Sequence, residues 1–274
     1  MLPVANKQPI MTDEGIHSLH STYAIDEHGQ SREMALTGER PLTIYLDKVE
    51  IVTLMTMGTQ PELLTLGYIL NQGFIQTLDD VVAIQVDWDV DAVAVTTRQQ
   101  QSDIDKILSK RTVTSGCGQG TMFGDVMASL DKINIQCPQF KAETIYSVLD
   151  GLTEYNKVYK QAGAVHGCAL CSSAGEVNVF IEDVGRHNAV DAISGWMLLH
   201  DISGHNKVFY TTGRLTSEMV IKVAQMQVPL LLSRSGITEM GLNIAKKMGI
   251  GLIARAKGKH FLVFNGLQYY QHDS

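Results

Sequence analysis

This sequence contains few cysteines, no long apolar run and no excess of positive charge. Four of the 274 residues are cysteine, too few for a disulfide scaffold of this length, so a reducing compartment is expected. Residues 1–15 lack the basic-then-apolar order of a signal peptide, and no apolar stretch approaches membrane-spanning length. The net charge of −7 argues against a general nucleic-acid surface. We therefore expect a cytoplasmic protein without membrane or nucleic-acid partners.

The sequence has the composition of an ordinary globular protein, with 45% hydrophobic and 19% charged residues. Its length allows one large domain or two small ones. Residues 1–38 are polar and aperiodic and indicate a solvated arm, although its histidines leave metal binding conceivable. Residues 39–140 are predicted to form a small α+β unit, and residues 141–274 an α/β domain. The arm's histidines are His17, His20 and His28.

The α+β unit is predicted from alternating and helical apolar patterns. Thr59 is expected to cap a helix that has Pro61 in its first turn and ends at Gly73. Residues 131–141 are expected to be a linker. The other expected elements are strands at 42–46 and 49–52 joined by a turn at Asp47 and Lys48, a hairpin of 81–86 with 92–97, and a short helix at 102–110.

The α/β domain is predicted from strands and helices that alternate along the chain, which implies parallel pairing and right-handed crossovers. The expected helices are 145–159, 187–199, 216–225 and 237–248, the last ending at Gly249. The expected strands are a hairpin of 164–171 with 177–181, followed by 208–211, 230–232, 252–254 and 261–264.

A glycine-rich stretch at 114–121 ends the α+β unit and carries one cysteine, Cys117, among Gly116, Gly118 and Gly120. Glycines this dense disfavour a helix or strand interior and predict an exposed loop. An accessible thiolate on such a loop suits nucleophilic or sulfur-carrying chemistry. Composition alone leaves a second interpretation open, in which Cys117 is one more small apolar residue beside a turn.

Two strand-to-helix junctions of the α/β domain share one design. Each combines glycine, hydroxyl groups and an arginine at a helix N-terminus: Arg214 at 211–218 and Arg234 at 233–239. Unpaired N–H groups and cations at such a terminus bind anions, phosphate above all, and open α/β sheets place ligands at the carboxyl ends of their strands. The alternative is that both are capped turns and nothing more.

Two further polar segments lie at predicted strand ends. Residues 182–191 contain Asp183, which could cap the next helix, and His187, which could contact a ligand or carry a proton. Near the C-terminus, three cations and a histidine surround a glycine turn and indicate an anion site. These residues are Arg255, Ala256, Lys257, Gly258, Lys259 and His260.

Cys168 and Cys171 have CxxC spacing, which is typical of zinc or redox sites. On a strand, residues three apart point to opposite faces, so these two thiols would diverge. No second CxxC completes a four-ligand site, and the segment after His166 lacks the zinc-deaminase pattern. A structural role is therefore expected for both cysteines. The alternative, a zinc hydrolase or deaminase, would be supported if metal analysis found stoichiometric zinc bound at Cys168 and Cys171.

Several motifs, taken in order, resemble the formate dehydrogenase accessory sulfurtransferase family (FdhD/NarQ), over nearly everything from Pro41 onward. They are Ser115-Gly116-Cys117-Gly118, Val165-His166-Gly167, the block from Glu182 to Asp191, Thr212-Gly213-Arg214 with Ser217-Glu218-Met219-Val220, and Ser233-Arg234-Ser235. The resemblance implies a sulfurtransferase that receives sulfur from a cysteine desulfurase as a persulfide. It would pass this sulfur to the molybdenum bis(molybdopterin guanine dinucleotide) cofactor before insertion into formate dehydrogenase. It also implies a homodimer and a C-terminal domain with a cytidine-deaminase-like three-layer fold that lacks the zinc.

Residue by residue, Cys117 matches the persulfide cysteine, and residues 255–260 match the family's cofactor-binding segment. Three further residues are candidates for cofactor binding because they lie at predicted strand ends: Arg214, Arg234 and His187. Gly120 stands where some members have a second cysteine, so a two-cysteine relay is unavailable; a single persulfide is still chemically sufficient. The alternative function is a cofactor-binding chaperone that carries no sulfur itself.

Overall fold

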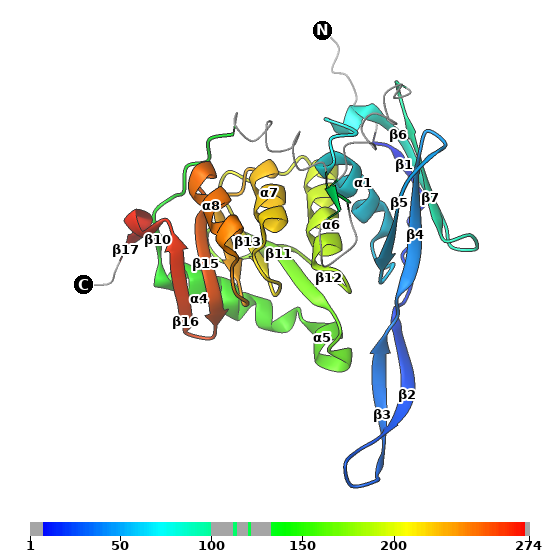
Figure 1. Ribbon diagram of the computed structural model, residues 1–274, viewed down its shortest axis with the longest axis horizontal. Coiled ribbons are helices and arrows are strands. Elements are labelled where there is room, and N and C mark those ends of the chain that lie inside the picture. Colours follow the sequence, from blue (N-terminus) through cyan, green and yellow to red (C-terminus); the bar gives the residue numbers. More distant parts are fainter. Residues whose placement is uncertain (1–7, 100–111, 114–119, 122–132, 272–274) are drawn as a thin grey trace.

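The computed structural model describes residues 8–99, 112–113, 120–121 and 133–271. These residues form two large sheets and a projecting hairpin (Figure 1). Among them, no helix is both long and apolar enough to cross a membrane. The helix expected at 102–110 and the loop around Cys117 lie outside the described residues.

The first sheet has five strands in the order β1-β6-β7-β4-β5, and its inner face consists of the alternating apolar residues that predicted it. Leu42, Ile44 and Leu46 are fully buried, and the predicted two-residue turn after them has the positive φ angles of a tight hairpin turn. The strands are β1 (Ile10–Met11), β4 (Arg40–Leu46), β5 (Val49–Thr56), β6 (Val81–Asp87) and β7 (Ala92–Thr97), with a 3-10 turn η1 (Leu78–Asp80) before β6.

Helix α1 (Pro61–Asn71) follows β5 and packs against β6 and β7 of this sheet. Its N-terminus differs in detail from the prediction. Pro61 occupies the first helical position as expected, but the N-cap is Gln60 and no side chain caps the helix. Thr59 therefore precedes the cap rather than forming it.

The polar arm is not irregular, as the sequence suggested, but contains a hairpin of β2 (Leu19–Ile25) and β3 (Ser31–Thr37) (Figure 1). Strand β3 lies beside helix α5 (Lys157–Ala162), and the turn end of the hairpin extends beyond the rest of the molecule. Its turn is held by Asp26, whose Oδ1 accepts the N–H of His28 at 3.0 Å and that of Gln30 at 2.9 Å. The prediction failed because this hairpin buries no continuous apolar face, so its strands lack the usual alternation. No group of side chains able to hold a metal occurs among the described residues, which include the three arm histidines.

The second sheet has six strands in the order β12-β11-β13-β14-β15-β16. Strands β13, β14 and β15 are parallel and the outer pairs antiparallel, so the predicted α/β pattern is confirmed. The strands are β11 (His166–Ser172), β12 (Val177–Asp183), β13 (Lys207–Thr211), β14 (Leu230–Ser233), β15 (Gly251–Lys257) and β16 (His260–Asn265). Short strands β10 (Phe140–Lys141) and β17 (Tyr270–Gln271) pair beside it, next to the 3-10 turn η3 (Leu267–Tyr269).

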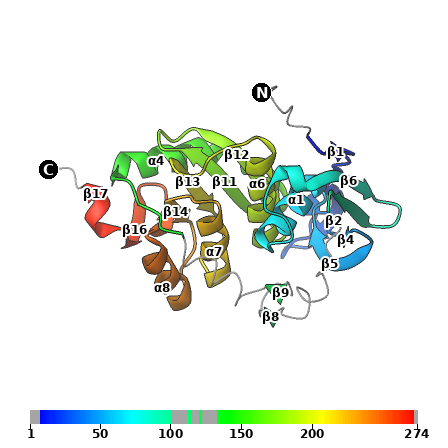
Figure 2. The same cartoon turned by 90° about the horizontal axis from the view of Figure 1, so that it is seen from above.

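Helices cover both faces of this sheet, which makes three layers (Figure 2). One face carries α6 (Arg186–Leu199), α7 (Ser217–Gln225) and α8 (Glu239–Met248); the other carries α4 (Ala142–Gly151). The single helix predicted at 145–159 is interrupted after Gly151 by the 3-10 turn η2 (Leu152–Glu154) and resumes as α5 (Lys157–Ala162). The deaminase-like description of this domain remains a prediction.

Cys168 and Cys171 confirm the strand geometry expected of the CxxC segment. Both are fully buried on β11, but Cys168 packs in the core under α6 to α8 and Cys171 in the core under α4. The two thiols therefore face opposite layers.

The two sheets share one hydrophobic core, because α1 packs directly on α6. A buried polar chain crosses this contact: Asn71 Nδ2 donates to Asp191 Oδ1 at 2.7 Å, and Lys222 Nζ donates to Asp191 Oδ2 at 2.7 Å. Burial raises the pKa of Asp191, and the Lys222 ammonium opposes that shift. The α1–α6 contact thus fixes how the first sheet sits relative to the second.

Candidate anion site and the cysteines

The loops that follow β13, β14 and β15 are tied together by backbone hydrogen bonds. Arg234 N donates to Thr211 O at 3.0 Å, and Arg255 N donates to Ser235 O at 2.9 Å. Ser233 Oγ also donates to the Gly213 carbonyl at 2.7 Å. Since the three strands are parallel, their carboxyl ends meet at one edge of the sheet, and these bonds hold the three loops side by side there.

This edge is rich in positive charge. Arg214, Arg234, Arg255, Lys257 and Lys259 all have exposed side chains, and none has a carboxylate partner in the described part of the chain. Free cations gathered beside strand ends favour binding of an anion. The structure thus brings the predicted arginines and lysines to the same edge of the sheet.

A cavity of about 500 Å³ opens at this edge between α5 and the junctions after β12, β13 and β14. Arg234 and Tyr159 both line it, and the guanidinium lies 5.7 Å from the centre of the Tyr159 ring. Such a contact holds an arginine in place while leaving its N–H groups free. Lys259 and His260 line a separate hollow of about 330 Å³ beside Tyr146, so the predicted residues share an edge but not one cavity.

His166 also lines the larger cavity, and the sequence reasoning did not select it. Burial, followed by the positive charges of Arg186 and Arg214, lowers the pKa of His166. A neutral imidazole can donate one hydrogen bond and accept another. The sequence feature that could have indicated His166 is its place in Val165-His166-Gly167, one of the motifs shared with the FdhD/NarQ family. Tyr159 had no such signal, because it appeared to be an ordinary apolar position of a helix.

Two acidic residues at the end of β12 would seem to oppose anion binding, but both carboxylates are occupied elsewhere. Glu182 accepts the N–H groups of Val158 at 3.0 Å and Tyr159 at 2.9 Å, which fixes the start of α5. Asp183 accepts from four donors that join the end of β5 to the start of α6; burial still raises its pKa. These donors are Thr56 Oγ1, Met57 N, Gly185 N and Asn188 Nδ2.

Two predicted contact residues are buried, which corrects their assignment. His187 is 1% exposed, and its Nδ1 lies 3.5 Å from Glu218 Oε1, between α6 and α7. Burial, with the nearby cations as a smaller cause, lowers its pKa to about 2, so it stays neutral and does not reach the cavity. Ala256 packs in the core under α4, so its side chain is also unavailable to a ligand.

The helix N-termini at the two arginine junctions differ. Thr238 Oγ1 accepts the N–H of Gly241 at 3.2 Å and caps α8, as the capped-turn interpretation predicts. Thr216 precedes α7 but makes no side-chain cap bond. N–H groups for an anion are therefore better supplied by α7 than by α8.

The three described cysteines are buried thiols. Burial raises the pKa of Cys137 to about 11 and that of Cys168 and Cys171 to about 12, so none supplies a thiolate near neutral pH. Cys117 lies outside the described residues, between β8 (Thr112–Val113) and β9 (Gly120–Thr121), which pair antiparallel. The described cysteines therefore offer no reactive thiol, and the role expected of Cys117 stays a prediction.

Fold and site together define an α/β protein with exposed cations at the carboxyl ends of its parallel strands. The chain belongs to the FdhD/NarQ family, whose model matches residues 37–270. It is 28% identical over 242 residues to a sulfur carrier protein FdhD of Listeria monocytogenes, covering 87% of this chain and 92% of that one. It is 29% identical over 232 residues to one of Bacillus pumilus, covering 82% and 86%. A crystal structure from Desulfotalea psychrophila, of a protein proposed to be a formate dehydrogenase accessory protein, has a TM-score of 0.74 at 28% identity, covering 92% and 98%.

Proposed function

We propose that this protein is a sulfur carrier for formate dehydrogenase that accepts sulfur on Cys117 and delivers it to a guanine-dinucleotide form of the molybdenum cofactor. The observation that carries the proposal is the state of the thiols: the three described cysteines are buried with raised pKa values. Relatives named sulfur carrier proteins support the carrier role. The cytoplasm is the proposed compartment, and a homodimer the proposed state.

The first step is a transfer between sulfur atoms. The Cys117 thiolate attacks the outer sulfur of a cysteine desulfurase persulfide, the donor's S–S bond breaks, and the donor cysteine leaves as a thiolate. Cys117 then carries the persulfide, with no net oxidation or reduction. In the second step the S–S bond at Cys117 breaks, the outer sulfur is reduced by two electrons to a sulfido ligand of molybdenum, and Cys117 returns to a thiol. The two electrons come from a dithiol reductant, which is oxidised to a disulfide.

The cofactor, as the substrate of this reaction, is proposed to bind at the cationic edge. Its phosphates would lie against Arg214, Arg234, Lys257 and Lys259, and its guanine portion could occupy the cavity beside Tyr159 and His166. These exposed cations have no carboxylate partner among the residues that the structure describes, which supports this placement, because charge-assisted contacts to phosphate need donors that no carboxylate already holds.

Complementation tests the proposal. In a strain lacking its own accessory protein, the wild-type chain and a Cys137→Ala variant should restore formate dehydrogenase activity, whereas Cys117→Ala should not. The Cys137 variant is the matched control, since it removes a buried thiol of raised pKa. Full activity with Cys117→Ala would instead identify a cofactor-binding chaperone that carries no sulfur.

A further inference from the structure

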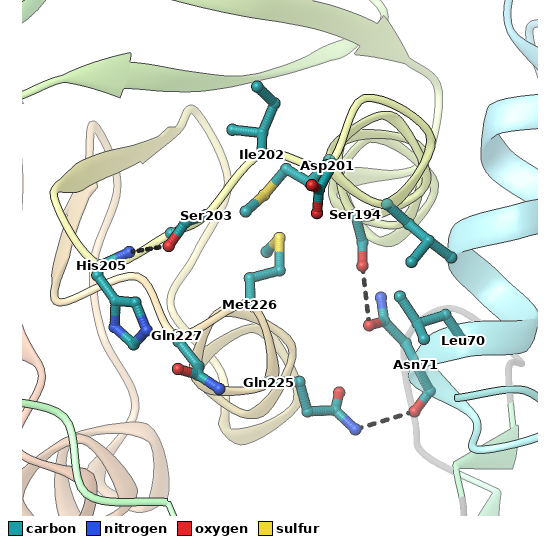
Figure 3. Close-up of a pocket in the computed structure, with 13 residues that line it drawn as sticks. Leu70, Asn71, Ser194, Asp201, Ile202, Ser203, His205, Gln225, Met226 and Gln227 are labelled. Atoms are coloured by element: carbon teal, nitrogen blue, oxygen red, sulfur yellow. Dashed lines mark hydrogen bonds between the residues drawn. The ribbon is translucent and has the colours of Figure 1, made fainter. Parts of the chain in front are cut away.

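A second cavity, of about 570 Å³, lies where α1, α6 and α7 end (Figure 3). Helices α6 and α7 begin near the anion edge, so this cavity sits at their opposite ends. The 14 residues of α6 separate the two ends by roughly 20 Å at 1.5 Å per residue. The cavity is therefore distinct from the proposed cofactor site.

The electrostatic character of this cavity is negative. The C-terminal end of a helix carries partial negative charge, which a lysine or arginine in the last turn commonly balances. Helices α1 and α6 have no basic residue there, and Lys222 of α7 is buried against Asp191. Among the described residues, no lysine or arginine lines the cavity; its titratable side chains are the exposed Asp201 carboxylate and the exposed His205 imidazole.

The ends of the three helices allow an internal comparison. The same backbone hydrogen bond ends each helix. The donor is the N–H of the second residue after the C-cap, and the acceptor is the carbonyl five residues before that donor: Phe74 to Ile69, Ile202 to Met197 and Val228 to Val223. This motif places the residue after the cap in the left-handed region, where glycine is favoured.

Only one of these three positions holds glycine. Gly73 follows α1, but Asp201 (φ 53°) follows α6 and Gln227 (φ 57°) follows α7. Both non-glycine side chains line the cavity, whereas Gly73 does not. The chain thus keeps a carboxylate and an amide at two positions where glycine would be conformationally easier, and both serve the same cavity.

The rest of the lining is mixed. Figure 3 shows the Asp201 side chain directed across the hollow toward Ser194 and Met226. Gln225 Nε2 donates to the Asn71 carbonyl at 3.1 Å, while its Oε1 has no donor among the described residues. Leucine, isoleucine and methionine side chains complete the walls. A ligand that fits this surface has an apolar stem and a cationic head rich in hydrogen-bond donors.

We propose that this cavity binds an organic cation, a guanidinium or primary ammonium group on a short aliphatic stem. Asp201 holds the charged head, helped by the negative ends of α1 and α6, and the apolar walls hold the stem. Such a group could come from a small metabolite or from an arginine or lysine side chain of a partner protein, and the chemistry recognised is the same in both cases.

The test is a titration of the full chain, followed by NMR, with butylguanidinium and with its neutral isostere butylurea. Butylguanidinium should bind with a dissociation constant on the order of 1 mM, as a small fragment can, and butylurea at least tenfold more weakly. A capped arginine tripeptide is the second arm: binding of the tripeptide as well indicates a protein side chain, and binding of the free cation alone indicates a small metabolite. Equal binding of the charged and neutral fragments, or of neither, overturns the proposal.

Variants at Asp201 separate ligand binding from folding. Asp201→Asn tolerates the left-handed conformation and removes the charge, and should weaken butylguanidinium binding roughly five- to tenfold. Asp201→Gly should lose the same affinity while raising the melting temperature, because it relieves the left-handed strain. Asp13→Asn is the matched control, since Asp13 is exposed with φ 58° but does not line the cavity. Unchanged affinity in both Asp201 variants contradicts the proposal.

Discussion

The contact between α1 and α6 depends on two glycines that face each other. A Cβ atom added at Gly67 would lie 1.7 Å from the Asp191 carbonyl oxygen, and one added at Gly195 would lie 2.1 Å from the Leu63 carbonyl oxygen. Both obstacles are backbone atoms, so rotation of a side chain cannot relieve them. We therefore expect Gly67→Ala to push the two helices apart.

The magnitude follows from two opposing effects. Alanine is about 1 kcal/mol more favourable than glycine inside a helix. Against this, inserting a methyl group into a packed interface costs about 1–3 kcal/mol, and separating the helices also weakens the buried Asn71–Asp191 hydrogen bond of 2.7 Å. Losing a buried charge-assisted bond costs about 1.5–3 kcal/mol. The expected net loss is about 1.5–5 kcal/mol, or roughly 3–20 °C in melting temperature for a chain of this size.

Urea unfolding of Gly67→Ala, with Gly236→Ala as the control, measures this loss. An added Cβ at Gly236 meets nothing within 4 Å and its φ is not positive, so the control should stay within about 0.5 kcal/mol of wild type. If Gly67→Ala is as stable as wild type or more so, helix propensity outweighs the contact and the close approach of α1 to α6 does not hold the two sheets together.

Three further predictions concern the anion edge and the buried histidine. Arg234→Ala should weaken GDP binding about tenfold in calorimetry, while Arg32→Ala on the projecting hairpin should not change it; equal losses would show only a general charge effect. Glu182→Ala should also weaken GDP binding, because the start of α5 and Tyr159 lose their anchor; tighter binding would mean that Glu182 acts only as a repelling charge. The pKa of His187 in the fold is about 2, below its ordinary value near 6.5, so the unfolded chain takes up a proton that the fold excludes. The free energy of unfolding should fall as the pH drops below about 6.5, by up to about 1.4 kcal/mol per pH unit from this group. His187→Gln should lack that part of the slope in urea unfolding at pH 7.5, 6 and 5, and identical slopes would place the loss in other groups.

The sequence predicted elements well wherever one apolar pattern dominated. Every strand and helix predicted from 164 onward is present, with ends shifted by at most three residues. Their apolar residues recur at a single period because each element buries one defined face. The hairpin at 19–37 was missed because it is held by the turn at Asp26 and by strand pairing rather than by a buried face. The interruption after Gly151 was missed because apolar residues continue at helical spacing through it.

The candidate site was predicted only in part, since local sequence does not report partners that lie far along the chain. Arg214 and Arg234 could be placed at one sheet edge because parallel strands bring their carboxyl ends together. The burial of His187 depends on Glu218, 31 residues further on, and on the packing of α6 against α7. The roles of Glu182 and Asp183 depend on α5 and on the end of β5 in the same way. No local pattern indicated either arrangement.

Sulfur loading of Cys117 is the central claim, and mass spectrometry tests it most directly. The protein would be incubated with a cysteine desulfurase and cysteine, labelled with a persulfide-specific reagent, digested, and mapped peptide by peptide. The proposal predicts one added sulfur on the peptide containing Cys117, none on those containing Cys137, Cys168 or Cys171, and no labelling of Cys117→Ala. Labelling that persists unchanged in Cys117→Ala, or that maps to one of the three buried cysteines, would contradict it.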